Sequence, residues 1–313
     1  MWILYALLAA FLWALVNYID KYIVTFLSAT KEVGSLILYS AFAGFPVCLV
    51  VYLIFGDQLL RIDLFSVVLI IAAGLFYILG LIPYLQAIAK DEVSTIIPQF
   101  MLIPIFGLMF EFLFGHVDIS TREAFGALLI LSGVIAINID KNGEGLLGFT
   151  IKKQTIFLML ISSLLIAMNA FIFKFISIEE DDFWLSAFWQ YFGFNIAGLV
   201  IFVFSKKYRQ DFLFAVYKNK EWGLIINGIG EAVAILGNLA FYFATMKDTL
   251  PIVQITSEGF QPLFVFFIGV LITYAQKMRT RTNLNLLRLA GNVRINHLFI
   301  ALIMLVGLIF INI

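Results

Sequence analysis

The sequence predicts an all-α integral membrane protein with ten transmembrane helices, arranged as two five-helix repeats of inverted topology. Three observations support this fold class: the composition, ten long apolar runs and an internal repeat. The 313 residues are 63% hydrophobic and include 34 phenylalanines, and the mean hydropathy is +1.03. Soluble globular domains are much less apolar. We therefore expect a multi-pass protein embedded in a lipid bilayer.

Charge and cysteine content exclude several other classes. The 20 basic and 20 acidic residues give a formal net charge of zero, so no nucleic-acid partner is expected. Cys48 is the single cysteine, which rules out an internal disulfide and a multi-cysteine metal or redox site. No phosphate-binding G-x-x-x-x-G-K-[ST] motif is present, so this chain does not itself carry an ATP-driven pump. No cofactor or metal is expected.

Ten apolar runs approach the length of about 20 residues that a helix needs to cross a bilayer. They cover residues 2–19, 33–55, 64–89, 93–114, 122–139, 155–177, 183–204, 222–245, 250–274 and 297–313. The three longest connections, residues 140–154, 205–221 and 275–296, are polar and basic. They are too short to hold a soluble catalytic domain.

An internal repeat pairs residues 78–106 with residues 235–264. Each copy consists of two apolar runs joined by a short charged turn, which predicts an antiparallel helical hairpin. The aligned pairs are Gly80 with Gly237, Ala87 with Ala244, Lys90 with Lys247, Asp91 with Asp248 and Pro104 with Pro262.

The repeat extends to the first helix of each half, where Lys21 aligns with Lys174. We therefore divide the chain into a first five-helix repeat, residues 1–139, a linker, residues 140–154, and a second five-helix repeat, residues 155–313. Because five is odd, the second repeat enters the membrane from the opposite side. Such an inverted pair is typical of secondary transporters that work by alternating access.

The hairpins have the form A-x-x-x-D followed by P-[IL]-F, and the final helices of the halves read LILSGVIAIN (129–138) and LIMLVGLIFIN (302–312). With these motifs the chain resembles the EamA group of the drug/metabolite transporter superfamily over nearly its whole length. The resemblance implies a transporter of a bacterial or archaeal cell membrane. It also implies a central cavity lined by the first four helices of each half, with the fifth and tenth at the periphery. The motifs of this family are degenerate, so they specify the architecture better than the substrate.

The distribution of basic residues predicts an orientation that differs from the family's. The odd-numbered connections carry sixteen lysines and arginines, whereas the even-numbered ones carry three, Arg61, Arg122 and Lys247. Basic residues accumulate on the cytoplasmic side of membrane proteins. The charge count therefore places both termini outside the cell, whereas the resemblance places them inside.

Polar side chains at membrane depth are costly and mark functional sites. In the ninth run, Gln254, Ser257, Glu258 and Gln261 follow the i, i+3, i+4, i+7 spacing of one helix face. We expect this stripe to bind substrate or protons.

The eighth run contributes a second set of polar residues, Asn227, Glu231 and Asn238, at i, i+4 and i+11. From their positions along the helices, Glu231 and Glu258 lie roughly 13 and 12 Å from opposite faces of a core about 30 Å thick. They are thus expected to share one midplane site that favours a proton or a cation. The matching helix of the first half offers Thr95 and Gln99 but no carboxylate.

A structural role for Glu258 is the main alternative. Lys174 lies near the end of the sixth run on the same membrane face and is within reach of an ion pair with Glu258. In that case the carboxylate would stabilise the fold and not bind a ligand.

These observations predict a secondary transporter for a small polar metabolite, cationic or zwitterionic, with proton coupling as an open possibility. The alternative in the same membrane is a flippase or exporter for a lipid-linked or amphiphilic molecule. A membrane-embedded enzyme lacks support, because the sequence has no H-E-x-x-H or G-x-S-x-G motif. The substrate, the direction of transport and the choice between monomer and homodimer stay undetermined by the sequence.

Overall fold

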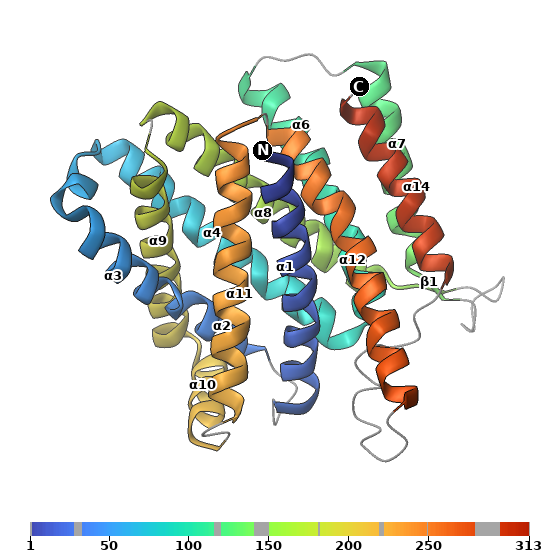
Figure 1. The fold of residues 1–313 in the computed structure, drawn as a ribbon, viewed down its shortest axis with the longest axis horizontal. Helices are drawn as coiled ribbons and strands as arrows, with labels where there is room; N and C mark the ends of the chain where they lie inside the picture. The colour runs from blue at the N-terminus through green and yellow to red at the C-terminus, as the bar shows by residue number, and fades with distance from the viewer. Residues whose placement is uncertain are drawn as a thin grey trace.

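A computed structural model of the chain describes residues 2–27, 33–115, 120–140, 150–180, 182–218, 222–248, 250–278 and 295–312 (Figure 1). The described part is almost entirely helical. Residues 141–149, most of the expected linker, lie outside it. Both ends of the chain lie on the same side of the helical bundle (Figure 1). The helices are α1 Trp2–Tyr22, α2 Gly34–Phe42, α3 Gly44–Phe55, α4 Leu64–Lys90, α5 Val93–Ile96, α6 Leu102–Gly115, α7 Thr121–Ile137, α8 Lys153–Glu179, α9 Phe183–Phe204, α10 Lys206–Lys218, α11 Trp222–Thr245, α12 Leu250–Met278 and α14 Ile295–Asn312.

Eight segments of the described chain are long and apolar enough to span a membrane, which confirms a multi-pass, all-α fold. The expected count of ten is not confirmed by this measure. The fifth expected span is α7, which has 17 residues, and the apolar part of the tenth is the short segment Asn296–Phe310.

Two of the expected spans are interrupted. The second consists of α2 and α3, which are separated at Ala43. The fourth contains a 3₁₀ segment, η3 Ile97–Met101, in which Pro98 occupies one of the first positions. Proline has no backbone N–H to donate, so it favours such a break in the helical hydrogen-bond pattern. Conversely, α1 continues into a π-helical turn, η1 Ile23–Leu27, beyond the expected end at residue 19.

Sequence analysis missed two features in the connections. Helix α10 lies within residues 205–221, which were expected to form a polar loop. A two-residue antiparallel strand pair, β1 Ile139–Asp140 with β2 Thr150–Ile151, closes the connection between the halves. Residues 205–221 do not reach the length and hydropathy of a span, which is why the apolar runs did not reveal α10.

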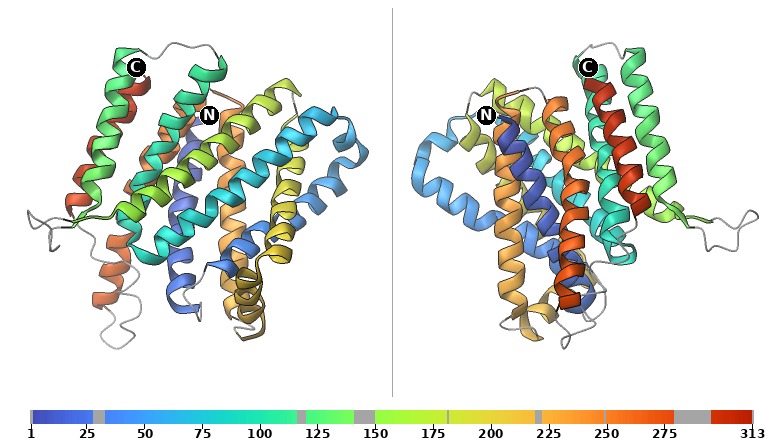
Figure 2. Two further views of the ribbon diagram at one scale, coloured as in Figure 1. Left: turned by 180° about the vertical axis from the view of Figure 1, so that it is seen from behind. Right: turned by 45° about the vertical axis from the view of Figure 1, so that its right-hand side comes forward.

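The helices of the two halves interleave. Helix α1 packs along α11 and α12 of the second half, and α8 packs along α4 and α6 of the first. Helices α7 and α14 pack against each other at the edge of the bundle (Figure 2). The interior is therefore built by the remaining helices.

Two lysines that the repeat aligns make the same contact. Lys21 Nζ, at the end of α1, donates to the carbonyl oxygen of Asp91 at 2.8 Å, just after α4. Lys174 Nζ, near the end of α8, donates to the carbonyl oxygen of Asp248 at 2.7 Å, shortly after α11. A cation is favourable at a helix C-terminus, where carbonyl oxygens lack helical partners. Each lysine thus ties the first helix of its half to the end of the third.

Helices α4 and α9 approach very closely where two glycines meet. A Cβ atom at Gly74 would lie 2.2 Å from the carbonyl oxygen of Gln190, and one at Gly193 would lie 2.5 Å from that of Ile71. Small residues allow membrane helices to pack backbone against backbone. The pair that the repeat relates to α4 and α9, namely α11 and α2, meets over a much shorter stretch.

Candidate functional site

A cavity of about 100 Å³ lies in the interior of the bundle. Its walls come from α1, α2, α4, η3, α6, α8, α9, α11 and α12, and α7 and α14 contribute none of them. The polar and aromatic residues that line it are Trp13, Asn17, Asp20, Ser40, Tyr77, Tyr84, Phe100, Tyr191, Phe194, Glu231, Asn238, Glu258 and Gln261.

Three carboxyl groups face this cavity, from Asp20 on α1, Glu231 on α11 and Glu258 on α12. None of the residues that line it is a lysine, arginine or histidine. Burying carboxylates without a nearby cation is unfavourable, so the cavity favours protons or a positively charged ligand.

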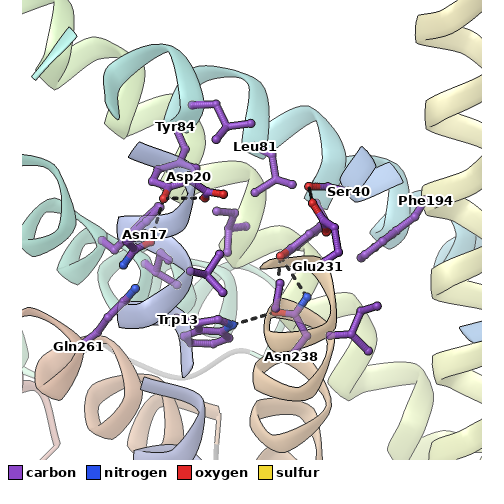
Figure 3. A pocket seen from close by; sticks show the side chains of 18 of the residues that line it. Trp13, Asn17, Asp20, Ser40, Leu81, Tyr84, Phe194, Glu231, Asn238 and Gln261 are labelled. Carbon is purple, nitrogen blue, oxygen red and sulfur yellow. Dashed lines mark hydrogen bonds between the residues drawn. The ribbon is translucent and has the colours of Figure 1, made fainter. Parts of the chain in front are cut away.

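Glu231 is held by a hydrogen bond across the cavity wall. Ser40 Oγ of α2 donates to Glu231 Oε1 at 2.6 Å (Figure 3). This bond joins helices of different halves in the region where α2 and α11 have little other contact.

Glu258 is 4% exposed, and no hydrogen bond or ion pair to its carboxylate is found in the part of the chain that the structure describes. Lys174, its proposed partner, donates instead to the carbonyl of Asp248. Gln261, one turn further along α12, lines the cavity beside it and has a buried Oε1 without a partner among the described residues. Both side chains are thus available to a ligand.

The remaining members of the α12 stripe lie away from the cavity lining. Ser257 Oγ donates to the carbonyl of Val253 in its own helix at 3.0 Å. Gln254 is fully buried against Gly107 on α6, and neither of its amide atoms has a hydrogen-bond partner among the described residues. The four residues of the stripe extend over about two helical turns, so the two ends of the stripe contact different neighbours.

Asn238 is, after Glu231, the second of the predicted α11 residues that lines the cavity. Its Oδ1 accepts from Trp13 Nε1 at 2.9 Å (Figure 3). Its Nδ2 donates to Tyr77 Oη at 3.0 Å. Asn227 is not among the lining residues, and its Nδ2 donates to the carbonyl of Gly223 in its own helix.

Thr95 and Gln99, the two residues predicted from the first half, do not line the cavity either. Gln99 Nε2 donates to the carbonyl of Thr95 at 2.9 Å and to Asn138 Oδ1 at 3.4 Å. Both residues are buried, and this contact joins η3 to the end of α7.

Sequence reasoning missed Asp20. The first expected span ends at residue 19, whereas α1 continues through Tyr22 and places this carboxyl in the cavity. The available signal was the i, i+3 spacing of Asn17 and Asp20, which puts both on one helix face.

The model of the EamA-like transporter family matches residues 1–139. The first 139 residues therefore resemble the EamA-like transporter family. EamA proteins form part of the drug/metabolite transporter superfamily, as the hairpin motifs indicated. This match and the eight long apolar helices indicate an integral, multi-pass membrane protein in a lipid bilayer.

A solved structure whose title reads "Crystal structure of protein" shares the fold, with a TM-score of 0.55 over 95% of each chain and 14% sequence identity. This likeness extends the architecture beyond the EamA match to nearly the whole length. None of the curated proteins matches the chain.

Proposed function

We propose that the protein is a secondary transporter that carries a small cationic or zwitterionic metabolite across a bacterial or archaeal cell membrane. The observation that supports this proposal most strongly is the cavity with three carboxyl groups and no basic lining residue. A carrier for anions would be expected to place lysine or arginine at the same depth.

Glu258 is the proposed contact for the positive group of the substrate, since its carboxylate faces the cavity and is not engaged in the described part of the chain. Gln261 and Asn238 supply amide groups for the polar part of a zwitterion. Tyr77 and Phe194 stack on each other with ring centroids 4.7 Å apart and form an aromatic wall. Aromatic faces attract cations.

Transport by alternating access follows from the proposed division into repeats, residues 1–139 and 155–313, with the linker 140–154 between them. Helices α4 and α9 pack closely at their two glycines, whereas α2 and α11 meet over a shorter stretch that includes the hydrogen bond between Ser40 and Glu231. In an inverted repeat, these two helix pairs exchange roles when the carrier changes state. The observed asymmetry is what one end state of such a cycle requires.

Purified protein in proteoliposomes tests the proposal by uptake of a panel of labelled amines, amino acids and organic anions, with and without a pH gradient. We expect saturable flux of cationic or zwitterionic compounds and none of anions. Anion flux alone would overturn the assignment. Movement of a fluorescent amphiphile between leaflets, without solute uptake, would instead favour the flippase alternative.

A further inference from the structure

A second polar cluster occupies the part of the cavity formed by α1 and α4, outside the predicted stripe. Tyr84 Oη lies 2.8 Å from Asn17 Oδ1 and 3.1 Å from Asp20 Oδ2 (Figure 3). Asn17 and Tyr84 are each 4% exposed, and Asp20 faces the cavity.

If Asp20 is ionised, this arrangement has too few hydrogen atoms to form both hydrogen bonds. A tyrosine hydroxyl has one proton to donate, yet two oxygen atoms lie within hydrogen-bond distance of it. Both contacts can be hydrogen bonds only if one of these two oxygen atoms carries a proton. Asp20 is the acid of the group, so the arrangement fits a carboxyl that donates to Tyr84 Oη while Tyr84 donates to Asn17 Oδ1.

The cluster also fits the ionised carboxylate after one rotation. Asn17 Nδ2 is buried and has no hydrogen-bond partner among the described residues. Turning this amide over exchanges its oxygen and nitrogen. Nδ2 then donates to Tyr84 Oη, and the hydroxyl donates to the Asp20 carboxylate. In both protonation states Tyr84 gives one hydrogen bond and accepts one.

We propose that Asp20 is the proton-binding residue of this transporter, with Tyr84 and Asn17 as positioning residues. On release, the O–H bond of Asp20 breaks and its proton leaves to cavity water. Tyr84 keeps its own proton and redirects it from Asn17 to Asp20. This inference rests on the proposed function and assigns proton and substrate to different acids, Asp20 and Glu258.

The surroundings of Asp20 couple the two ligands. The titratable groups that face it are Glu231 from α11, Glu258 from α12, and Tyr77 and Tyr84 from α4. The ammonium group of Lys21, the next residue along α1, donates to backbone carbonyls at the end of α4. Negative neighbours favour a proton on Asp20, whereas a cation entering the cavity favours its release. The proton and a cationic substrate are therefore expected to exchange in opposite directions.

Infrared difference spectroscopy of the full-length protein in lipid vesicles tests the assignment without a substrate. Between about pH 5 and about pH 9, we expect loss of the C=O band of a buried protonated carboxyl together with a change in a tyrosine band. Asp20→Asn should remove both signals. Tyr84→Phe should remove the tyrosine change and keep a carboxyl band. Asp57→Asn, at an exposed site, is the matched control and should alter neither.

The proposal is overturned if the carboxyl band survives in Asp20→Asn or disappears in Glu258→Gln instead. If Asp20→Asn does not fold, Tyr84→Phe decides, because an unchanged tyrosine signal in that variant contradicts the role of Tyr84. Failure of the proposed transport function would give a different result: the infrared changes would persist while the proteoliposomes show no solute flux.

Discussion

Glu258 presents a carboxylate to the cavity at a depth where charge is expensive. The described chain offers no counter-ion, so an ordinary structural role would leave the cost of its burial uncompensated. A ligand that brings positive charge removes this cost, and the site therefore has a physical reason to bind one.

Replacing Glu258 by glutamine keeps the shape and removes the charge. We expect affinity for a cationic substrate to fall at least about tenfold, since losing one partner of a buried charge pair costs about 2 kcal/mol or more. Concentration-dependent uptake in proteoliposomes measures the change, with Asp57→Asn as control. Unaltered affinity in Glu258→Gln would show that the carboxylate does not contact the substrate.

The bond between Ser40 and Glu231 is expected to stabilise the limited contact between α2 and α11. A double-mutant cycle of Ser40→Ala and Glu231→Gln should give a coupling of about 1.5 to 3 kcal/mol, the range for hydrogen bonds that involve a charged group. Denaturant unfolding in detergent micelles measures it. Additive effects would mean that the 2.6 Å contact contributes nothing to stability.

Residues of the site were predictable where polarity interrupts an apolar run. Glu231, Asn238, Glu258 and Gln261 stand out in this way, and all four line the cavity. Asp20 was not predicted because it follows directly on the apolar residues and precedes Lys21, a combination typical of a loop. Only the continuation of α1 past it brings the carboxyl into the interior.

At the level of helices, the contact of α4 with α9 depends on two glycines. Gly193→Ala should destabilise the protein by about 1 to 3 kcal/mol, because the added methyl group meets the backbone of α4 and the helices must separate. Gly228→Ala is the matched control, since a Cβ there has nothing within 4 Å. Thermal unfolding of both variants should separate them, and equal midpoints would contradict the close packing.

Helix α10 is tied to the start of α2 through Asp211, which is 6% exposed and accepts a hydrogen bond from Ser35 N at 2.8 Å. The first N–H groups of a helix lack helical partners, so this carboxylate serves as a cap supplied by another helix. Asp211→Ala should cost about 1 kcal/mol of stability, whereas Gln210→Ala, at an exposed neighbour, should cost little. Chemical unfolding compares the two, and similar losses would argue against the cap.

For the molecule as a whole, the charge count predicts that both termini lie outside the cell. In a Cys48→Ala background, an impermeant thiol reagent added to intact cells should label Asp57→Cys, in an even-numbered connection. It should not label Lys207→Cys, in an odd-numbered one. The reverse pattern would show that the family's orientation outweighs the distribution of basic residues.

The multi-pass, all-α architecture was predictable because the long apolar runs are a property of the sequence itself. The sequence aligned Lys21 with Lys174 but did not predict what they contact. The structure shows that each lysine donates a hydrogen bond to a backbone carbonyl in the equivalent turn of its half. The asymmetry between the two helix pairs could not be predicted from the sequence, because the repeat aligns the two pairs without indicating how closely each of them packs.

In the proposed carrier, the acidic cavity would also make transport sensitive to membrane voltage. An empty cavity with ionised carboxylates carries net negative charge, whereas one loaded with a cation or a proton is closer to neutral. Moving one elementary charge through a potential of 100 mV changes the free energy by about 2.3 kcal/mol. The resting potential of a cell would therefore act far more on a carrier whose empty cavity is ionised than on one that holds a cation or a proton.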